Sequence, residues 1–222
     1  RGSAEVLERL GVNINADRVC QQRCLNTANI CFCFAPNHHP AIKHVMPIRR
    51  SLGFPTIFNY LGPLTNPCSA GRQLIGTWDA ESLIPMAQSL AGGDGTRAAV
   101  VHSMDGLDEC SVSDNTRVIH VEGNSMHEEV LAPTNIGLRL WPLEAAVAKD
   151  LDGAVAMMLG VLDGTDKGAP RDMVLLNTAL ALRVAGLVTG IEQGIDRSRT
   201  AIESGAVMET MALWTACSQE TT

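Results

Sequence analysis

Aromatic residues are scarce in this sequence, at 4% of 222 residues, and charged residues make up only 18%. No uninterrupted apolar run approaches the roughly 18–20 residues that span a bilayer. The N-terminal RGSAEVLERLG also lacks the basic-then-apolar order of a signal peptide. We therefore expect a soluble cytoplasmic protein with no membrane partner, or a plastid protein if the source is a plant.

Positive charge is in short supply as well. The 17 lysines and arginines face 24 acidic residues, which gives a formal net charge of −7 and a pI near 5.3. Such a chain is poorly suited to grip a phosphate backbone unless it has a locally basic face, so nucleic acid is not expected as a partner. Apolar residues, in contrast, make up 45%, which is typical of a globular protein with a sizeable core.

Neither a phosphate-binding P-loop nor a G-x-G-x-x-G motif after a strand is present. The seven cysteines are odd in number, with C-x₃-C spacing from Cys20 and C-x-C spacing from Cys31 instead of the paired C-x₂-C of a zinc ribbon. Reduced core thiols are therefore predicted, with NICFCF, residues 29–34, as a buried strand. Cys110 has no evident base partner, so we do not expect it to act as a nucleophile.

Strand and helix patterns alternate along the chain. Strands are predicted at 29–34, 72–78, 97–102, 116–121 and 125–131, the last two as an antiparallel hairpin that turns at 122–124. Helices are predicted from Ser3 to Gly11, at 17–26 with Val19 and Leu25 on or near the buried side, and at 80–92, 150–162, 171–186 and 196–214. This alternation predicts an α/β fold, in which a central sheet is flanked by helices.

An acidic pair follows the predicted strand at 97–102. The sequence DGLDECS, residues 105–111, places Asp108 and Glu109 side by side where the chain leaves the sheet. Neighbouring residues in extended chain point to opposite sides, so the two carboxylates are not expected to chelate one ion together. They could hold two hard cations such as Mg²⁺, whose remaining ligands are water and substrate phosphate. A solvated acidic loop is the competing interpretation, although the edge of an α/β sheet is a common ligand site.

A proline-rich, basic segment interrupts the alternation at residues 36–66. It carries His38, His39, Arg49 and Arg50 among apolar residues and is expected to form short helices joined by turns. An arginine fork is the usual partner of a carboxylate or a phosphate, while a solvated basic face is the alternative. The histidines do not follow the i, i+4 spacing of metal-binding helices, so no zinc site is expected. At its end the sequence GPLTNP, residues 62–67, suits a pocket wall or a plain tight loop equally well.

Five longer segments are more specific than composition. They are GSAEVLERLGV, FAPNHHPAIKHVMPIRRSLGFPTIFNYLGPLTNP, HSMDGLDECS, RDMVLLNTALAL and IESGAVMETM, and they run from Gly2 to about Met211. In this order and spacing they resemble anthranilate phosphoribosyltransferase. The resemblance implies an enzyme of tryptophan biosynthesis with the nucleoside phosphorylase/phosphoribosyltransferase type of fold, a small helical domain on a larger α/β domain, usually as a homodimer. Its reaction joins the amine of anthranilate to C1 of phosphoribosyl pyrophosphate and releases pyrophosphate.

The resemblance also implies roles for single residues. Asp108 and Glu109 match the acidic pair that holds Mg²⁺ on the pyrophosphate, and Arg49 matches the arginine that pairs with the anthranilate carboxylate. Positions that line the anthranilate channel match Pro36, His39, Ile42 and Gly62. Loss of pyrophosphate builds negative charge on the leaving group, which a metal can neutralise. Positioning of the weakly basic aromatic amine should matter more than a strong general base, and no catalytic acid or base is assigned.

The family pattern has parts that these 222 residues do not contain. Its GTGGD loop, the NxST segment after that loop and its KHGN motif belong before GSAEVLE. We therefore expect the C-terminal two-thirds of the family's chain, with residues 1–35 and 67–222 in the α/β domain and 36–66 as the return segment of an otherwise missing helical domain. Alone, this chain is expected to bind phosphoribosyl pyrophosphate poorly and to have little or no turnover.

Two other functions compete with this interpretation. A pyrimidine nucleoside phosphorylase of the same fold would use phosphate and a nucleoside, but DGLDE and HHPAIKHVMPIRR disfavour it. A non-catalytic relative could bind nucleic acid through a basic surface, against which stand the net charge of −7 and the intact acidic pair.

Overall fold

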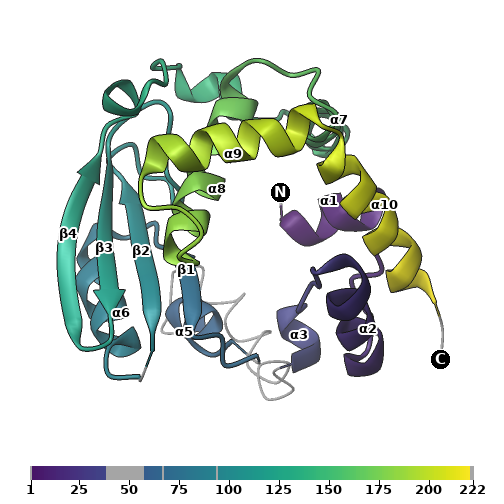
Figure 1. The fold of residues 1–222 in the computed structure, drawn as a ribbon, viewed down its shortest axis with the longest axis horizontal. Coiled ribbons are helices and arrows are strands. Elements are labelled where there is room, and N and C mark those ends of the chain that lie inside the picture. Colours follow the sequence, from purple (N-terminus) through teal and green to yellow (C-terminus); the bar gives the residue numbers. More distant parts are fainter. Residues whose placement is uncertain (1, 39–57, 67, 94, 221–222) are drawn as a thin grey trace, which may run out of the picture. The chain divides into compact units, whose positions relative to one another are not determined.

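The computed structural model describes residues 2–38, 58–66, 68–93 and 95–220 (Figure 1). The chain divides into two compact units. The helical unit consists of Arg1–Thr56, Ala148–Thr165 and Ala201–Thr222, and the sheet unit consists of Ile57–Val147 and Asp166–Thr200. These limits differ from the predicted domain limits, which refer to a longer family chain and stay a prediction.

The sheet unit is built on a four-stranded sheet in the order β1-β2-β3-β4. Its strands are β1 (Arg72–Gly76), β2 (Arg97–Ser103), β3 (Thr116–Glu122) and β4 (Ser125–Leu131). The β1–β2 pair is parallel, while β2–β3 and β3–β4 are antiparallel. These strands confirm four of the five predicted, including the hairpin that turns at 123–124, and the mixed sheet flanked by helices confirms the α/β fold.

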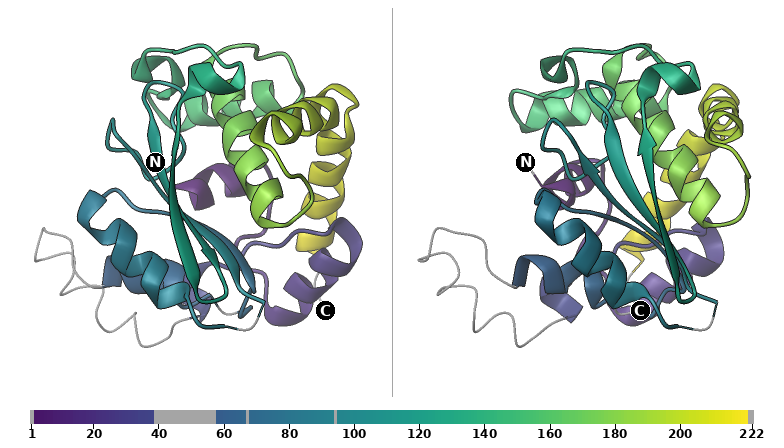
Figure 2. Two further views of the ribbon diagram at one scale, coloured as in Figure 1. Left: turned by 60° about the vertical axis from the view of Figure 1, so that its left-hand side comes forward. Right: turned by 90° about the vertical axis from the view of Figure 1, so that its left-hand side faces the viewer.

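Helices cover both faces of this sheet (Figure 2). The connection from β1 to β2 contains the short helix η1 (Ala80–Ser82) and α6 (Leu83–Leu90), as predicted for 80–92. Alternate residues of the strands, such as Val100 and Val121, pack with Leu83 and Met86 of α6 in one apolar cluster. The other face contacts α8 (Ala169–Val184), whose Leu175, Leu176, Ala179 and Leu180 are buried. The core therefore lies on both sides of the two central strands.

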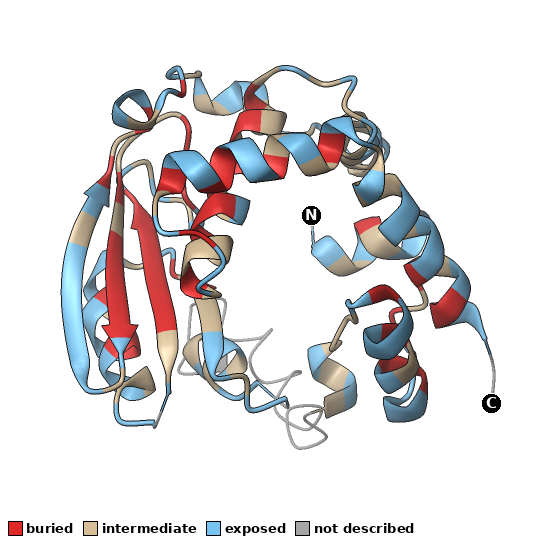
Figure 3. Cartoon of the chain, viewed as in Figure 1, coloured by how far each residue is buried: buried red, intermediate tan, exposed pale blue. Residues whose placement is uncertain are grey.

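The two central strands are mostly buried, and β4 is mostly exposed (Figure 3). Every residue of β2 after Arg97 is buried, whereas Leu131 is the only buried residue of β4, which is one of the two edge strands. The sheet unit also contains α5 (Phe58–Leu64), η2 (Pro133–Ile136), η3 (Leu143–Ala146) and most of α9 (Ile191–Glu203). Gly194 of α9 lies so close to α8 that an added Cβ would be 2.7 Å from the Ala179 Cβ, so glycine permits this packing.

The helical unit contains α1 (Ser3–Arg9), α2 (Arg18–Ala28), α3 (Ala35–His38), α7 (Leu151–Leu162) and α10 (Ala206–Gln219). Its core forms where α2 packs on α10, with Cys20, Cys24, Trp214 and Cys217 buried in one cluster. The Cys20 thiol lies 3.5 Å from the Cys217 carbonyl oxygen as its donor. Burial raises the pKa of Cys24 to about 12, which agrees with the predicted reduced core thiols.

Three sequence predictions about this unit were wrong. Residues 30–34 pair with no described strand, and Cys31 and Cys33 are only half-buried, so NICFCF is not a buried strand in the described structure. In α2 the residues Val19 and Leu25 are exposed, because the helix packs on α10 through its other side, which carries Cys20 and Cys24. The predicted helix at 196–214 is divided between α9 and α10, since Gly205 has a left-handed backbone.

The helices of the described residues are too short or too polar to cross a membrane.

Candidate functional site

The acidic pair lies in the loop that joins β2 to β3. Because β1 and β2 are parallel, their C-terminal ends meet at one edge of the sheet, and the loop starts there. A tight turn opens it: the Gly106 amide donates to the Ser103 carbonyl at 2.9 Å, and the Ser103 amide donates to the Leu107 carbonyl at 2.9 Å. Gly106 has a φ of +93°, which favours glycine. Sequence and structure thus agree on where the acidic pair leaves the sheet.

Asp105 holds the loop together from within. Its carboxylate accepts hydrogen bonds from the hydroxyls of Ser111 and Ser113, both at 2.5 Å, and from the Leu107 amide at 3.3 Å. Burial alone would raise its pKa, but the serine hydroxyls reverse this effect and hold the pKa of Asp105 below its usual value. Asp105 therefore stabilises the loop, because its carboxylate accepts hydrogen bonds from other residues of the same loop.

Asn177 of α8 fixes the residue next to the acidic pair. Its side-chain oxygen accepts from the Cys110 amide at 2.9 Å, and its side-chain nitrogen donates to the Cys110 carbonyl at 2.8 Å. The same nitrogen donates to the Met173 carbonyl at 2.9 Å. Burial raises the pKa of the Cys110 thiol to about 12, so the thiol stays protonated and is a poor nucleophile, as expected.

Gly76, the last residue of β1, brings the loop against the sheet. A Cβ on Gly76 would lie 1.5 Å from the Asp108 carbonyl oxygen, a distance that real Cβ atoms do not show. Only glycine therefore allows the backbone of the acidic pair to approach the end of β1 this closely. The sequence pattern RQLIGTW contained this glycine, but its role required the tertiary contact.

Asp108 and Glu109 are themselves exposed at the surface. Loss of water around its carboxylate, and then the negative charge of Asp108, raise the pKa of Glu109 above its usual value. A bound cation would relieve both effects. The described residues hold no group of three or more His, Cys, Asp or Glu side chains that could bind a metal. Two carboxylates fit Mg²⁺, which takes one or two protein carboxylates and completes its shell with water and phosphate.

A second polar group at this edge was missed by sequence reasoning. Asp79, three residues after β1, accepts hydrogen bonds from the Ser82 hydroxyl at 2.5 Å and the Tyr60 hydroxyl at 3.0 Å, which lower its pKa. His102 of β2 lies with its Nδ1 2.9 Å from the Thr77 carbonyl oxygen. The signal in the sequence was the polar pair Thr77 and Asp79 at the end of the strand predicted at 72–78.

The remaining predicted site residues are only partly described. Gly62 lies in α5 of the sheet unit, where an added Cβ would meet nothing within 4 Å. Pro36 lies in α3 of the helical unit. His39, Ile42 and Arg49 lie outside the described residues. The structure therefore brings together Asp108 and Glu109 with Gly76, but leaves the predicted anthranilate residues as predictions.

A sequence model described as the glycosyl transferase family, a/b domain, matches residues 1–208. The chain belongs to this family. Within the family it is similar to anthranilate phosphoribosyltransferases, which confirms the resemblance. One such protein, from Rubrobacter xylanophilus, is 42% identical over 207 residues, which are 93% of this chain and 60% of that protein.

Solved structures of anthranilate phosphoribosyltransferases agree. The anthranilate phosphoribosyltransferase of Thermus thermophilus matches with a TM-score of 0.88 and 34% identity, over 99% of this chain and 65% of its own. The Saccharomyces cerevisiae enzyme in complex with 4-fluoroanthranilate matches with a TM-score of 0.88 and 25% identity, over 98% and 63%. A variant of that yeast enzyme was solved with Mg bound. The chain spans 60–65% of the length of these relatives.

Proposed function

We propose that this chain forms part of an anthranilate phosphoribosyltransferase, which transfers the phosphoribosyl group of phosphoribosyl pyrophosphate to anthranilate in tryptophan biosynthesis. The observation that carries the proposal is the acidic loop. This loop lies at a sheet edge suited to ligands and presents two exposed carboxylates. Its backbone is held by hydrogen bonds of Asp105 and Asn177. The chain is also 42% identical to a protein named anthranilate phosphoribosyltransferase. The Mg bound in the yeast variant supports the use of a metal.

Asp108 and Glu109 are the residues that would hold Mg²⁺. The metal would neutralise the charge that develops on the leaving pyrophosphate. The loop around the two carboxylates is anchored at Asp105, at Cys110 and against Gly76, so they are held in place before the substrate arrives. Preorganised charge of this kind lowers the barrier because little reorganisation remains to be done during the reaction.

The roles of the anthranilate residues rest on the resemblance. Arg49 pairs with the anthranilate carboxylate in this proposal, and Pro36, His39, Ile42 and Gly62 line its channel. The fluorinated anthranilate bound by the yeast relative supports a substrate of this class. The complete enzyme is proposed to act as a homodimer, again from the resemblance.

The 222 residues contain neither GTGGD nor KHGN. We propose that they bind phosphoribosyl pyrophosphate weakly when tested alone, because one side of the pyrophosphate then lacks its contacts. A steady-state assay of the 222-residue chain beside a protein that also carries these segments tests this. Equal turnover of the two proteins would refute it.

Arg49→Ala in the longer protein tests the substrate assignment. Loss of a charge-assisted bond of about 1–3 kcal/mol should raise the KM for anthranilate by roughly 5–150-fold. The KM for phosphoribosyl pyrophosphate should change little. Arg139→Ala, at an exposed position of the sheet unit, is the control. An unchanged KM for anthranilate would remove Arg49 from the site.

A further inference from the structure

Two cysteine side chains lie close together in the segment that joins α2 to α3. Only Phe32 separates Cys31 from Cys33 in the sequence, and the two sulfur atoms are 4.0 Å apart. Neither cysteine is in a disulfide in this structure. The aromatic rings of Phe32 and Phe34 stack on each other in turn, with 6.1 Å between their centroids. The alternating sequence thus brings thiol next to thiol and ring next to ring.

This thiol pair is accessible and is not part of a sheet in the described structure. Residues 30–34 belong to no helix or strand there, since α2 ends at Ala28 and α3 begins at Ala35. Cys31 packs at the edge of the core between α2 and α10, and both cysteines are half-buried. A small reagent can therefore reach the pair, and no ladder of strand hydrogen bonds opposes a local change of its backbone.

The sulfur–sulfur distance is close to what a disulfide requires. The bond itself is about 2.05 Å long, so the two sulfur atoms would have to approach each other by about 2 Å. Rotation of one or both side chains about the Cα–Cβ bond provides a movement of this size. A ring closed across a single residue is tight, and strained, accessible disulfides are the labile and easily reduced kind. The pair is therefore suited to a reversible bond instead of a permanent crosslink.

The other cysteines are less suited to this chemistry. Four of them are buried, namely Cys20, Cys24, Cys110 and Cys217. Burial raises the pKa of Cys24 and of Cys110 to about 12, so the thiolate that attacks a disulfide is scarce at both positions. Cys68 is exposed, but it belongs to the sheet unit, whereas the thiol pair belongs to the helical unit. Oxidation to an intrachain disulfide is therefore expected first at the thiol pair.

We propose that Cys31 and Cys33 form a modification site, which small disulfides such as glutathione disulfide oxidise to a reversible intrachain disulfide. In the first step the thiolate of one cysteine attacks a sulfur of the small disulfide, whose S–S bond breaks as a mixed disulfide forms and one small thiolate leaves. In the second step the thiolate of the other cysteine attacks the protein sulfur of the mixed disulfide and releases the second small thiolate. The two protein thiols give up two electrons to the small disulfide, and their two protons end on the two small thiols.

Oxidation of the folded 222-residue chain by glutathione disulfide tests the site. Cys68→Ser removes the exposed thiol and serves as the parent protein. After oxidation, the remaining thiols are alkylated in denaturant and counted by mass spectrometry. We expect the parent to lose two alkylatable thiols and to retain no glutathione. Chymotrypsin cuts after Phe32 and so separates Cys31 from Cys33, and the two peptides should stay linked until dithiothreitol reduces them.

Three variants of this parent complete the test. Cys31→Ser and Cys33→Ser should each lose one thiol and retain one glutathione, because the second thiol that would release it is absent. Cys24→Ala, the matched control, removes a buried thiol of the same unit and should still lose two thiols. Thermal unfolding shows whether each variant folds.

The parent protein alone can also overturn the proposal, whether or not the variants fold. An unchanged thiol count, a glutathione that stays bound, or a linked peptide that contains Cys24 would each do so. Loss of two thiols in Cys33→Ser, or retention of both in Cys24→Ala, would likewise show that the disulfide joins other cysteines.

Discussion

Removal of the Asn177 side chain tests whether α8 fixes the acidic loop. In the structure this one amide pairs with both the amide and the carbonyl of Cys110, which is fully buried at 0% exposure. It also donates to the Met173 carbonyl, which α8 already uses in its own hydrogen-bond ladder. Asn177→Ala therefore leaves two buried backbone groups of the loop without partners.

Each buried group that loses its partner costs about 1–3 kcal/mol. Because Asn177 itself is half-buried, water can partly replace its side-chain amide in the variant. The cost for each of the two Cys110 backbone groups should therefore lie near the lower end of that range. We expect Asn177→Ala to lower the free energy of unfolding by about 2–3 kcal/mol in total.

Urea unfolding followed by circular dichroism measures this change. The matched control is Asn135→Ala, an exposed asparagine of η2, which should stay within about 0.5 kcal/mol of the parent. If Asn177→Ala were as stable as this control, the loop would not depend on α8 for its position.

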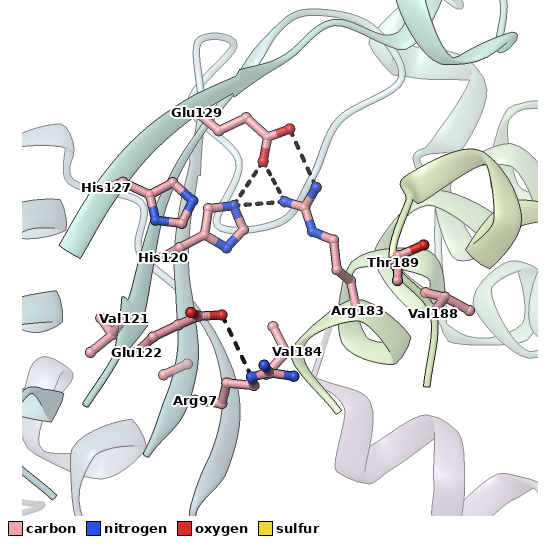
Figure 4. Close-up of a pocket in the computed structure, with 11 residues that line it drawn as sticks. Arg97, His120, Val121, Glu122, His127, Glu129, Arg183, Val184, Val188 and Thr189 are labelled. Carbon is pink, nitrogen blue, oxygen red and sulfur yellow. Dashed lines mark hydrogen bonds and ion pairs between the residues drawn. The ribbon is translucent and has the colours of Figure 1, made fainter. Parts of the chain in front are cut away.

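Two further predictions concern the sheet unit. Burial lowers the pKa of His120, which contacts Arg183 of α8 (Figure 4), relative to the unfolded chain, so the folded state binds fewer protons, and stability should fall as pH drops below about 6.5. The urea midpoint of unfolding should therefore be lower at about pH 5.5 than at about pH 7, and His120→Gln should make this difference smaller. An unchanged difference in His120→Gln would contradict the prediction. Gly76→Ala should lower the free energy of unfolding by about 2 kcal/mol or more, because the added Cβ would collide with the Asp108 carbonyl oxygen. Gly71→Ala is the control, since a Cβ at Gly71 would meet nothing within 4 Å. Equal stability of both variants would count against the close approach.

Local patterns predicted the sheet unit well. The strands at 72–78, 97–102 and 116–131 are marked by alternation and by turn residues such as Gly123, and both signals act over a few residues. The helical unit was less predictable from the same kind of pattern. Which side of α2 is buried depends on its packing against α10, nearly two hundred residues later, and NICFCF can be a strand only where a neighbouring strand pairs with it.

The candidate site shows the same limit. The pair Asp108 and Glu109 was visible in the sequence because it follows a strand, but the groups that position it were not. In the sequence, Asn177 cannot be distinguished from other polar residues of a helix, and Gly76 cannot be distinguished from other residues at the end of a strand. Their roles follow from the contacts of Asn177 with Cys110 and of Gly76 with Asp108. Contacts between distant segments decide both roles, and no short sequence motif records them.

The proposed function requires that Asp108 and Glu109 hold Mg²⁺ on phosphoribosyl pyrophosphate. Calorimetric binding of phosphoribosyl pyrophosphate to the longer protein, with and without Mg²⁺, measures this directly. We expect Mg²⁺ to tighten binding in the parent and in the exposed control Glu144→Gln, and we expect the double variant Asp108→Asn, Glu109→Gln to lose this Mg²⁺ dependence. An equal Mg²⁺ effect in the double variant and the parent would show that Asp108 and Glu109 do not hold the metal.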